Sequence, residues 1–316
     1  MGLGADITRF FAGVNARNEG GILQPYSMSD FYDEHKNHLE SMMVIPGICQ
    51  KLVLRHVLTY VGRNLSENRL FMGDMYYCLS FNEGVANYGS YDFLAFGAPH
   101  IRGHFLHSVL PIIVEKNDGT QDIGTGFLVE GGRIVTARHC VEAMKTISVP
   151  GCSEAPSRVF ALSGGNDDVA VIDFSVNPFP QYPKFQMRKH FALEEVITMG
   201  YPPIPGFDML LVTEKSHLAA DLKSSKGAIV AEGMTYLYGE DYILMNARVK
   251  GGNSGGPVIG EDGKVIGLIS EIPSTENGLD ALGYGVVTPI SKVQELLSSQ
   301  EVDVDNLEFN WRSLPS

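Results

Sequence analysis

Apolar residues recur at helical spacing in the first third of the chain and in short β-type runs beyond residue 108. A helix is predicted over residues 48–64, because apolar side chains there recur at steps of three and four: Ile48, Leu52, Val53, Val57 and Val61. A preceding helix over residues 30–43, capped by Ser29 or Asp30, is expected to end before Pro46 and Gly47. Residues 70–100, rich in Gly, Tyr and Phe, predict one or two short strands with loops.

Beyond residue 108 the chain consists of short β-branched runs separated by turn residues such as those of 117–119 and 261–263. Many short strands at close spacing predict a mainly β sandwich or barrel. Residues 291–300 predict a closing helix. We therefore divide the chain into a mostly helical and aromatic extension over 1–105, a β domain over 106–300 and an acidic tail over 301–316.

Composition narrows the class of protein. Of the 316 residues, 44% are hydrophobic and 19% charged, which is typical of a globular chain. The net charge of −13 argues against a general nucleic-acid binder, and no apolar run reaches the length of a membrane span. The first residues lack an apolar signal run, and the four cysteines form no C-x-x-C pair. We therefore expect a cytoplasmic protein with free cysteines and no cofactor.

Three segments hold residue types that act together in nucleophilic catalysis: RIVTARHCVEA around His139, GGNDDVAVIDF around Asp168 and KGGNSGGPVIG around Ser254. A serine hydroxyl is a weak nucleophile that needs an adjacent base, and a histidine has the pKa to take and return the proton. A carboxylate fixes the imidazole tautomer. Asp168 is preferred because it directly precedes the strand-like VAVI, and Asp167 is the alternative.

The glycine run around the serine predicts a tight loop that turns backbone N–H groups inward. Such donors stabilise the oxyanion that forms when a carbonyl is attacked. The candidate donors are the N–H groups of Gly252, Asn253 and Ser254, with Gly252 and Ser254 as the natural pair.

TARHC, DVAVI and GNSGGPV, in this order, resemble the three signatures of chymotrypsin/trypsin-like serine proteases, and most closely the bacterial branch of HtrA-type and glutamyl endopeptidases. The resemblance covers roughly residues 108–298. It implies two six-stranded antiparallel β-barrels with the site in the cleft between them. It also implies peptide-bond hydrolysis through an acyl-enzyme on Ser254, with His139 as base and acid and Asp168 orienting the ring.

The same resemblance suggests substrate-binding positions, which are Arg248, Ser270, Glu271, Ile272, Tyr284 and Gly285. Arg248 falls at the base of the primary pocket, where it would favour an acidic side chain, or it points to solvent. Ser270 matches the serine beside the triad aspartate.

Two positions depart from the pattern of the family. Asn253 replaces the aspartate of trypsin-type enzymes, and Cys140 lacks its usual partner on the preceding hairpin, so we expect a free thiol.

Other readings of the sequence are weaker. All nine histidines precede Ser254, which excludes the Ser-Asp-His order of an α/β-hydrolase. A metal site of His100, His104 and His107 is disfavoured by the neighbouring Pro99 and Gly103. A non-catalytic peptide-binding module is the alternative to the enzyme. Residues 1–105 are either a regulatory or partner-binding region or a stabilising extension.

Overall fold

We describe the protein from a computed structural model. The described residues are 2–13, 17–19, 22–35, 44–67, 71–142, 144–152, 154–162, 167–202, 222–234, 241–270, 284–298 and 301–304. The chain forms two compact units, Met1–Ile101 and Arg102–Ser316. Each unit has its own hydrophobic core. No helix in the described ranges is long and apolar enough to cross a membrane.

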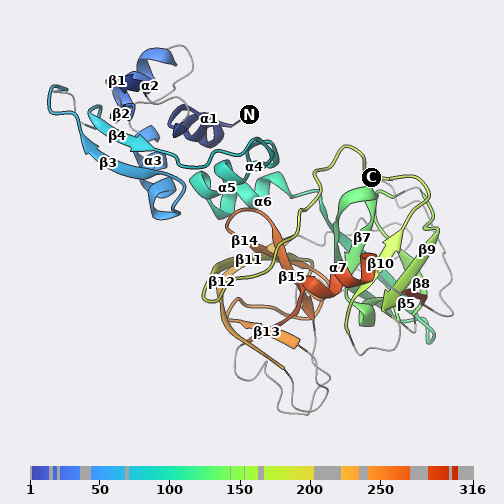
Figure 1. Ribbon diagram of the computed structural model, residues 1–316. Helices are drawn as coiled ribbons and strands as arrows, with labels where there is room; N and C mark the ends of the chain where they lie inside the picture. The colour runs from blue at the N-terminus through green and yellow to red at the C-terminus, as the bar shows by residue number, and fades with distance from the viewer. Residues whose placement is uncertain are drawn as a thin grey trace. The chain divides into compact units, whose positions relative to one another are not determined.

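The first unit combines short helices with two small hairpins (Figure 1). Its elements are α1 (Leu3–Phe10), β1 (Arg17–Glu19), β2 (Ile22–Gln24), α2 (Met28–Glu34), α3 (Val44–Leu54), β3 (Thr59–Arg63), β4 (Asp74–Tyr77), α4 (Glu83–Tyr88), α5 (Ser90–Phe96) and α6 (Ala98–His104), which runs on into the second unit. Its core is aromatic: the Phe10 ring lies edge-on to Phe11 and to Phe31, each at 5.1 Å between ring centroids.

The structure corrects three predictions about the helices of the first unit, and each correction has a physical reason. Ser27, not Ser29 or Asp30, caps α2, and Asp30 completes the capping box by accepting from the Ser27 N–H at 2.8 Å. Pro46 does not end a helix but lies in the first turn of α3, where its missing N–H costs nothing. The predicted helix over 48–64 is wrong beyond Leu54, because residues 59–63 pair with β4 as a strand.

The segment 70–100 contains more helix than the sequence predicts. It forms the strand β4, the short helices α4 and α5, and the start of α6. Asn82 caps α4 by accepting from the Val85 N–H at 3.1 Å, and Gly89, at φ +95°, ends that helix in the left-handed region. The aromatic residues of this segment serve as helix core rather than as strand faces, since Tyr91 and Phe93 are buried.

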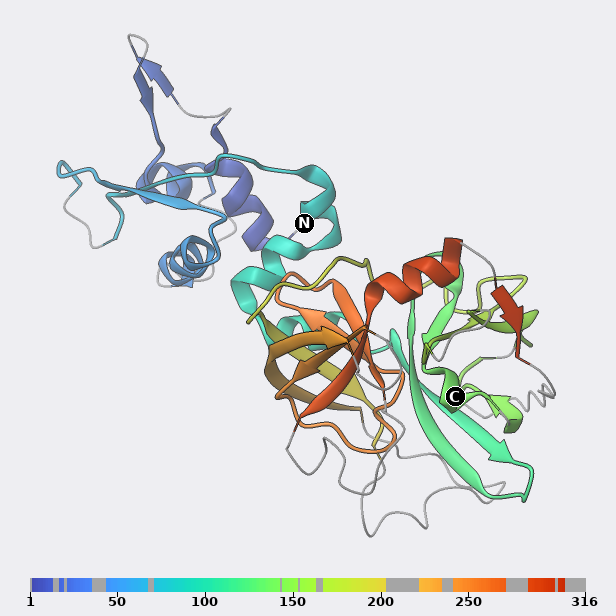
Figure 2. The same ribbon diagram turned by 60° about the horizontal axis from the view of Figure 1, so that its bottom comes forward.

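The second unit contains two antiparallel sheets (Figure 2). An open seven-stranded sheet has the order β17-β9-β10-β7-β6-β5-β8, and a closed barrel is formed by β11, β12, β13, β16, β15 and β14. The strands of the open sheet are β5 (Val109–Lys116), β6 (Gln121–Leu128), β7 (Ile134–Thr136), β8 (Met144–Ser148), β9 (Arg158–Leu162), β10 (Ala170–Asp173) and β17 (Glu301–Asp303). Those of the barrel are β11 (Glu195–Gly200), β12 (Lys223–Met234), β13 (Asp241–Met245), β14 (Pro257–Gly260), β15 (Val265–Ser270) and β16 (Gly285–Pro289). Helix α7 (Ile290–Ser298) follows β16, and two 3-10 turns, η2 (Glu130–Gly132) and η3 (Arg138–Cys140), flank β7.

The mainly β class and one six-stranded barrel are confirmed, but the first of the two expected barrels differs. Its strands form an open sheet among the described residues, because the second edge of β9 pairs with β17. Glu301 lies opposite Leu162 and Asp303 opposite Phe160. The first three residues of the predicted acidic tail therefore extend this sheet and cover what would otherwise be an unpaired strand edge.

A buried arginine joins the connection between the two sheets to the barrel. Arg188 makes a two-pronged ion pair with Glu194, at 2.6 and 3.2 Å, and donates from Nε to Asp262 in the β14–β15 turn at 2.9 Å. The three side chains are only 19%, 9% and 21% exposed. Gly260 makes room for the guanidinium, since a Cβ there would lie 2.2 Å from Nη2.

We expect Arg188→Met to lower the free energy of unfolding by about 3 kcal/mol, because it leaves two largely buried carboxylates without their cation. Denaturant unfolding of the whole chain, followed by circular dichroism, measures this change. The matched control is Lys226→Met, which breaks an exposed pair with Glu195 at 3.9 Å and should cost less than about 0.5 kcal/mol. Equal effects of the two substitutions would contradict a structural role for the Arg188 pair.

Candidate active site

His139 and Asp168 meet because the strands that carry them are paired. His139 lies in η3 just after β7, and Asp168 lies just before β10, which runs antiparallel to β7 with Ala170 opposite Thr136. The His139 ring Nδ1 is 2.7 Å from Asp168 Oδ2, and the His139 backbone N–H donates to Oδ1 at 2.9 Å. Asp168 therefore fixes both the main chain and the ring of His139.

A third donor reaches Asp168 from the barrel. The Ser270 hydroxyl, at the end of β15, donates to Asp168 Oδ2 at 2.5 Å, and both side chains are buried. Burial alone raises the pKa of Asp168, but the donors from His139 and Ser270 outweigh it and hold this pKa below the usual 3.8. Asp168 is thus kept as an anion, the form that holds an imidazole in one tautomer.

The structure separates the two aspartates between which the sequence left a choice. Asp167 Oδ2 accepts from Lys292 Nζ of α7 at 3.1 Å, whereas Asp168 faces His139. The ion pair raises the pKa of Lys292, although its burial acts in the opposite direction. Asp167 is therefore committed to anchoring α7, and Asp168 is the carboxylate beside the imidazole.

The loop that carries Ser254 is held from both sheets. On the barrel side, the Gly255 N–H donates to the Ile269 carbonyl of β15 at 2.7 Å. On the other side, Thr125 of β6 donates from its N–H to the Ser254 carbonyl at 2.9 Å and from its hydroxyl to the Gly252 carbonyl at 2.6 Å. Gly255 has φ +81°, and a Cβ there would lie 2.2 Å from the Thr125 carbonyl oxygen, so only glycine fits.

Ser254 lies in this neighbourhood, but its side chain does not bind His139 directly. No hydrogen bond joins its hydroxyl to another residue of the described ranges, and the side chain is only slightly exposed. The two segments are linked instead through Cys140, whose Sγ is 3.7 Å from His139 Nε2 and 3.6 Å from the Ser254 carbonyl oxygen. Catalytic hydrogen bonds of this kind are often absent before substrate binds.

The predicted oxyanion donors need one correction. The Asn253 N–H donates to the Lys250 carbonyl at 3.0 Å within a tight turn, so it is not available as an oxyanion donor. Among the described residues, the N–H groups of Gly252 and Ser254 have no acceptor. The pair of donors available to a substrate oxygen is therefore Gly252 and Ser254.

Burial and hydrogen bonding shift the pKa of His139 in opposite directions. Burial alone lowers the pKa of His139, but the hydrogen bond to the Asp168 carboxylate, with a further one involving the Cys140 sulfur, outweighs it and holds the pKa above the usual 6.5. A base with a raised pKa takes a proton more readily, and it is available in its neutral form only at higher pH.

The predicted substrate-binding residues are described in part. Arg248 is exposed, Tyr284 is partly exposed, and Gly285 is buried against the Met245 and Val249 side chains. Ser270 supports Asp168, as described above. Glu271 and Ile272 lie outside the described residues.

Sequence reasoning missed two residues that shape the site. Thr125 ties the Ser254 loop to β6, and its position between two glycines in IGTGF was the available signal. Cys140 was considered only as a possible disulfide partner, although its place directly after His139 already puts its sulfur near the ring. All four cysteines are free and buried.

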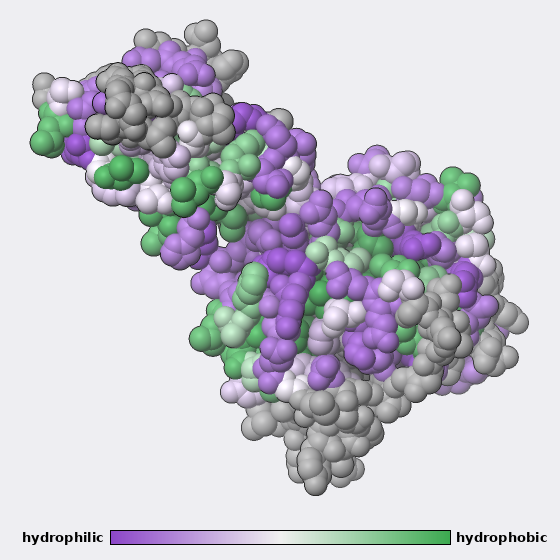
Figure 3. Space-filling model, in the orientation of Figure 1, coloured by the Kyte–Doolittle hydropathy of each residue, from purple (hydrophilic) through white to green (hydrophobic). Residues whose placement is uncertain are grey.

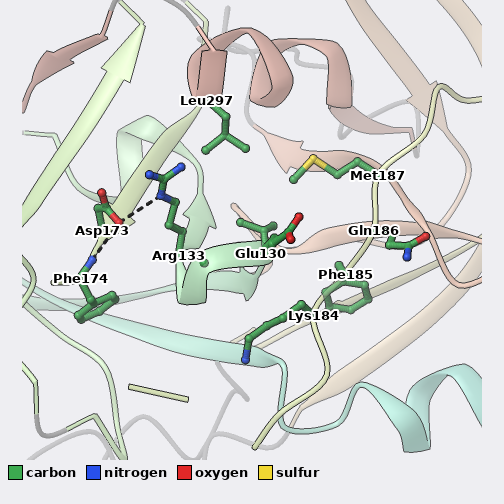
Figure 4. A pocket seen from close by; sticks show the side chains of 11 residues that line it. Glu130, Arg133, Asp173, Phe174, Lys184, Phe185, Gln186, Met187 and Leu297 are labelled. Atoms are coloured by element: carbon green, nitrogen blue, oxygen red, sulfur yellow. Dashed lines mark hydrogen bonds and ion pairs between the residues drawn. The ribbon is translucent and has the colours of Figure 1, made fainter. Parts of the chain in front are cut away.

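A groove in the second unit is lined by other residues than those of this site (Figure 4). It has a volume of about 1120 Å³ and is lined by η2, the end of β10, residues 184–187 and Leu297 of α7. Arg133 and Asp173 form an ion pair within it at 3.2 Å.

No cluster of three metal-ligating side chains occurs in the described ranges. The rings of His100, His104 and His107 each pack against an aromatic ring.

Comparisons with known proteins found similar sequences and structures. Residues 124–268 match the family described as trypsin-like peptidase domain. The chain is 31% identical over 185 residues to a probable periplasmic serine endoprotease DegP-like of Chlamydia pneumoniae, covering 56% of this chain and 34% of the relative. It is 27% identical over 204 residues to the serine protease Do-like HtrA of Bacillus subtilis, covering 60% and 43%.

The chain thus spans between a third and a half of the length of these relatives. Among solved structures, the active form of the Rv3671c protease from M. tuberculosis is similar over 64% of this chain and 86% of that chain, with 19% identity and a TM-score of 0.48. The predicted resemblance to trypsin-like and HtrA-type proteases is confirmed by the family match and the named relatives. Residues 124–268 of this chain are therefore similar to the trypsin-like peptidase domain family.

Proposed function

We propose that the protein is a serine endopeptidase that hydrolyses peptide bonds through an acyl-enzyme on Ser254. The observation that carries this proposal is the 2.7 Å contact between His139 Nδ1 and Asp168, with Asp168 locked by Ser270 and the Ser254 loop beside it. The family match and the names of the relatives, which are serine endoproteases, support the same activity.

The residues divide the reaction between them. His139 takes the Ser254 proton at Nε2 as the hydroxyl oxygen attacks the substrate carbonyl, and Asp168 stabilises the imidazolium that forms. The N–H groups of Gly252 and Ser254 bind the oxyanion. His139 then gives the proton to the leaving amine, which leaves the acyl group on Ser254. Water, deprotonated by His139, hydrolyses this ester and restores the serine.

The substrate in this proposal is a polypeptide bound in extended form along residues 270–272, which needs backbone hydrogen bonds but no particular side chain. Within the described residues Arg248 has no ion-pair partner. An acidic preference at the cleavage site, set by charge pairing with Arg248, stays a prediction.

Residues 1–101 are, in this proposal, a regulatory or partner-binding part. They form a separate unit with its own core, and the unit carries hydrophobic side chains at its surface (Figure 3). Leu65 and Leu79 are 88% and 83% exposed, so they contribute little to the core of the unit. Exposed apolar side chains of this kind can serve as contact points for another protein.

A cytoplasmic location also stays a prediction. The free state of all four cysteines supports a reducing compartment, whereas the DegP-like relative is named as periplasmic.

Ser254→Ala should abolish both peptide cleavage and labelling by a fluorophosphonate, because it removes the nucleophile while a methyl group fits the same space. Cleavage is measured with a fluorogenic peptide library, and the fold by circular dichroism. Continued cleavage by the variant would contradict the mechanism. Tight peptide binding by the unmodified protein without any cleavage would favour the non-catalytic peptide-binding alternative.

Asp168→Asn should lower kcat by about 10⁴-fold, because an amide at this position favours the wrong imidazole tautomer. Asp167→Asn is the matched control: it removes one neighbouring carboxylate but touches Lys292 rather than His139, so it should have a far smaller effect. The measurement is the kcat of each variant on the same peptide substrate, obtained from steady-state kinetics. A larger loss in Asp167→Asn would reverse the assignment of the two aspartates.

Leu65→Glu combined with Leu79→Glu should leave kcat/KM for a short peptide unchanged, because the substitutions lie in the first unit and leave its core intact. Cleavage of a whole-protein substrate such as casein should fall, because in this proposal these side chains contact the protein substrate or a partner. The control Leu193→Glu adds a charge at an exposed leucine of the second unit. Parallel changes for peptide and protein substrates would argue against a separate role for the first unit.

A further inference from the structure

The Cys140 sulfur contacts the edge of His139 that the proposed mechanism uses. Nδ1 of the ring is taken by Asp168, so Nε2 is the nitrogen left to deprotonate Ser254. Cys140 Sγ lies 3.7 Å from this Nε2 and 3.6 Å from the Ser254 carbonyl oxygen. The Ser254 hydroxyl, by contrast, has no hydrogen-bond partner among the described residues although its side chain is 94% buried, being 6% exposed. Among the described residues, the Cys140 thiol is thus the group that lies within hydrogen-bond distance of Nε2.

The fold holds the sulfur in this place. Cys140 is 7% exposed and free of any disulfide. Gly124 of β6 provides the space, since a Cβ there would lie 2.8 Å from Cys140 Sγ and 3.1 Å from its Cβ. Any larger residue at 124 would push the sulfur away from its present position. The close contact between Sγ and the imidazole is therefore a feature of the packing between η3 and β6.

Resting on the proposed function, we propose that Cys140 is a positioning residue of the site, whose thiol holds the Nε2 edge of His139 until Ser254 engages it. With neutral His139, the S–H donates to Nε2 or to the Ser254 carbonyl, its two neighbours. With protonated His139, the Nε2–H donates to the sulfur while the S–H turns to the Ser254 carbonyl. No covalent bond changes, and in both states the single S–H of the thiol has an acceptor within reach.

The second arrangement stabilises the imidazolium, so Cys140 adds to the effect of Asp168 in raising the pKa of His139. The other charged groups near the ring are already paired among themselves. Asp167 binds Lys292 of α7, and Arg138, on the same turn as His139, binds Glu142 at 2.9 Å. Ser270 of β15 acts through Asp168. Among the described residues, Asp168 and Cys140 are therefore the two groups whose hydrogen bonds raise the pKa of His139 against the lowering effect of its burial.

Cys140→Ala should lower the pKa of His139 by about half a pH unit, the shift expected from losing one weak hydrogen bond to the charged form. The pKa is read from NMR titration of the His139 ring protons in a Ser254→Ala background, which requires no peptidase activity. In the active protein, the acid limb of kcat/KM should move to lower pH by the same amount, because the neutral ring then persists to lower pH. Cys140→Ser, which keeps a donor and acceptor, should restore at least part of the shift.

The matched control is Cys152→Ala, which removes another buried free thiol of the same unit, one that donates to the Glu154 carbonyl at 3.2 Å. It should leave the titration of His139 unchanged. If Cys140→Ala does not fold, Cys140→Val fills the space without a donor and gives the same comparison. An unchanged pKa of His139 in the folded Cys140 variant, or an equal shift in Cys152→Ala, would overturn the proposal. Absence of peptide cleavage by the unmodified protein would instead count against the proposed function, while the NMR result would stand.

Discussion

The arrangement of the site depends on one buried carboxylate. A charge in the position of Asp168 is costly unless donors surround it, and the donors come from both sheets: His139 follows β7, and Ser270 ends β15 of the barrel. The hydrogen bonds that stabilise the charge therefore also join the open sheet to the closed barrel. The geometry of the imidazole follows from that join, because the ring and the backbone of His139 are held by the same carboxylate.

A second join between the sheets positions the serine. Thr125 of β6 donates to the carbonyls of Gly252 and Ser254, and its hydroxyl also accepts from the Tyr201 N–H that follows β11. The left-handed Gly255 lets the loop approach β6 this closely. Loops usually carry function because a rigid scaffold holds them, and here the scaffold is the pair of sheets on either side of the loop.

The pairing of His139 with Asp168 was predictable from the sequence, while much of their surroundings was not. The residues around His139, Asp168 and Ser254 are local signatures, each set by one turn or strand end, so short motifs are enough to find them. The sequence preferred Asp168 to Asp167 from its place before the VAVI strand, but the role of Asp167 needed the position of Lys292, which lies 125 residues further along. The open form of the first sheet likewise depends on β17 reaching β9 across the chain. The helix predicted over 48–64 failed because tertiary pairing with β4 overrode an apolar periodicity that fits a helix.

The same two joins hold the Ser254 main chain and the His139 ring independently of each other. The main chain of Ser254 is fixed by Thr125 and by β15, so its position does not depend on a hydrogen bond from the hydroxyl. The ring of His139 is fixed by Asp168, so its position does not depend on Ser254 either. Each partner is thus held by contacts of its own that draw on both sheets, and none of these contacts is a hydrogen bond between the Ser254 hydroxyl and His139. Within the described residues, the group in hydrogen-bond contact with Nε2 is the sulfur of Cys140, which the packing of η3 on β6 places there.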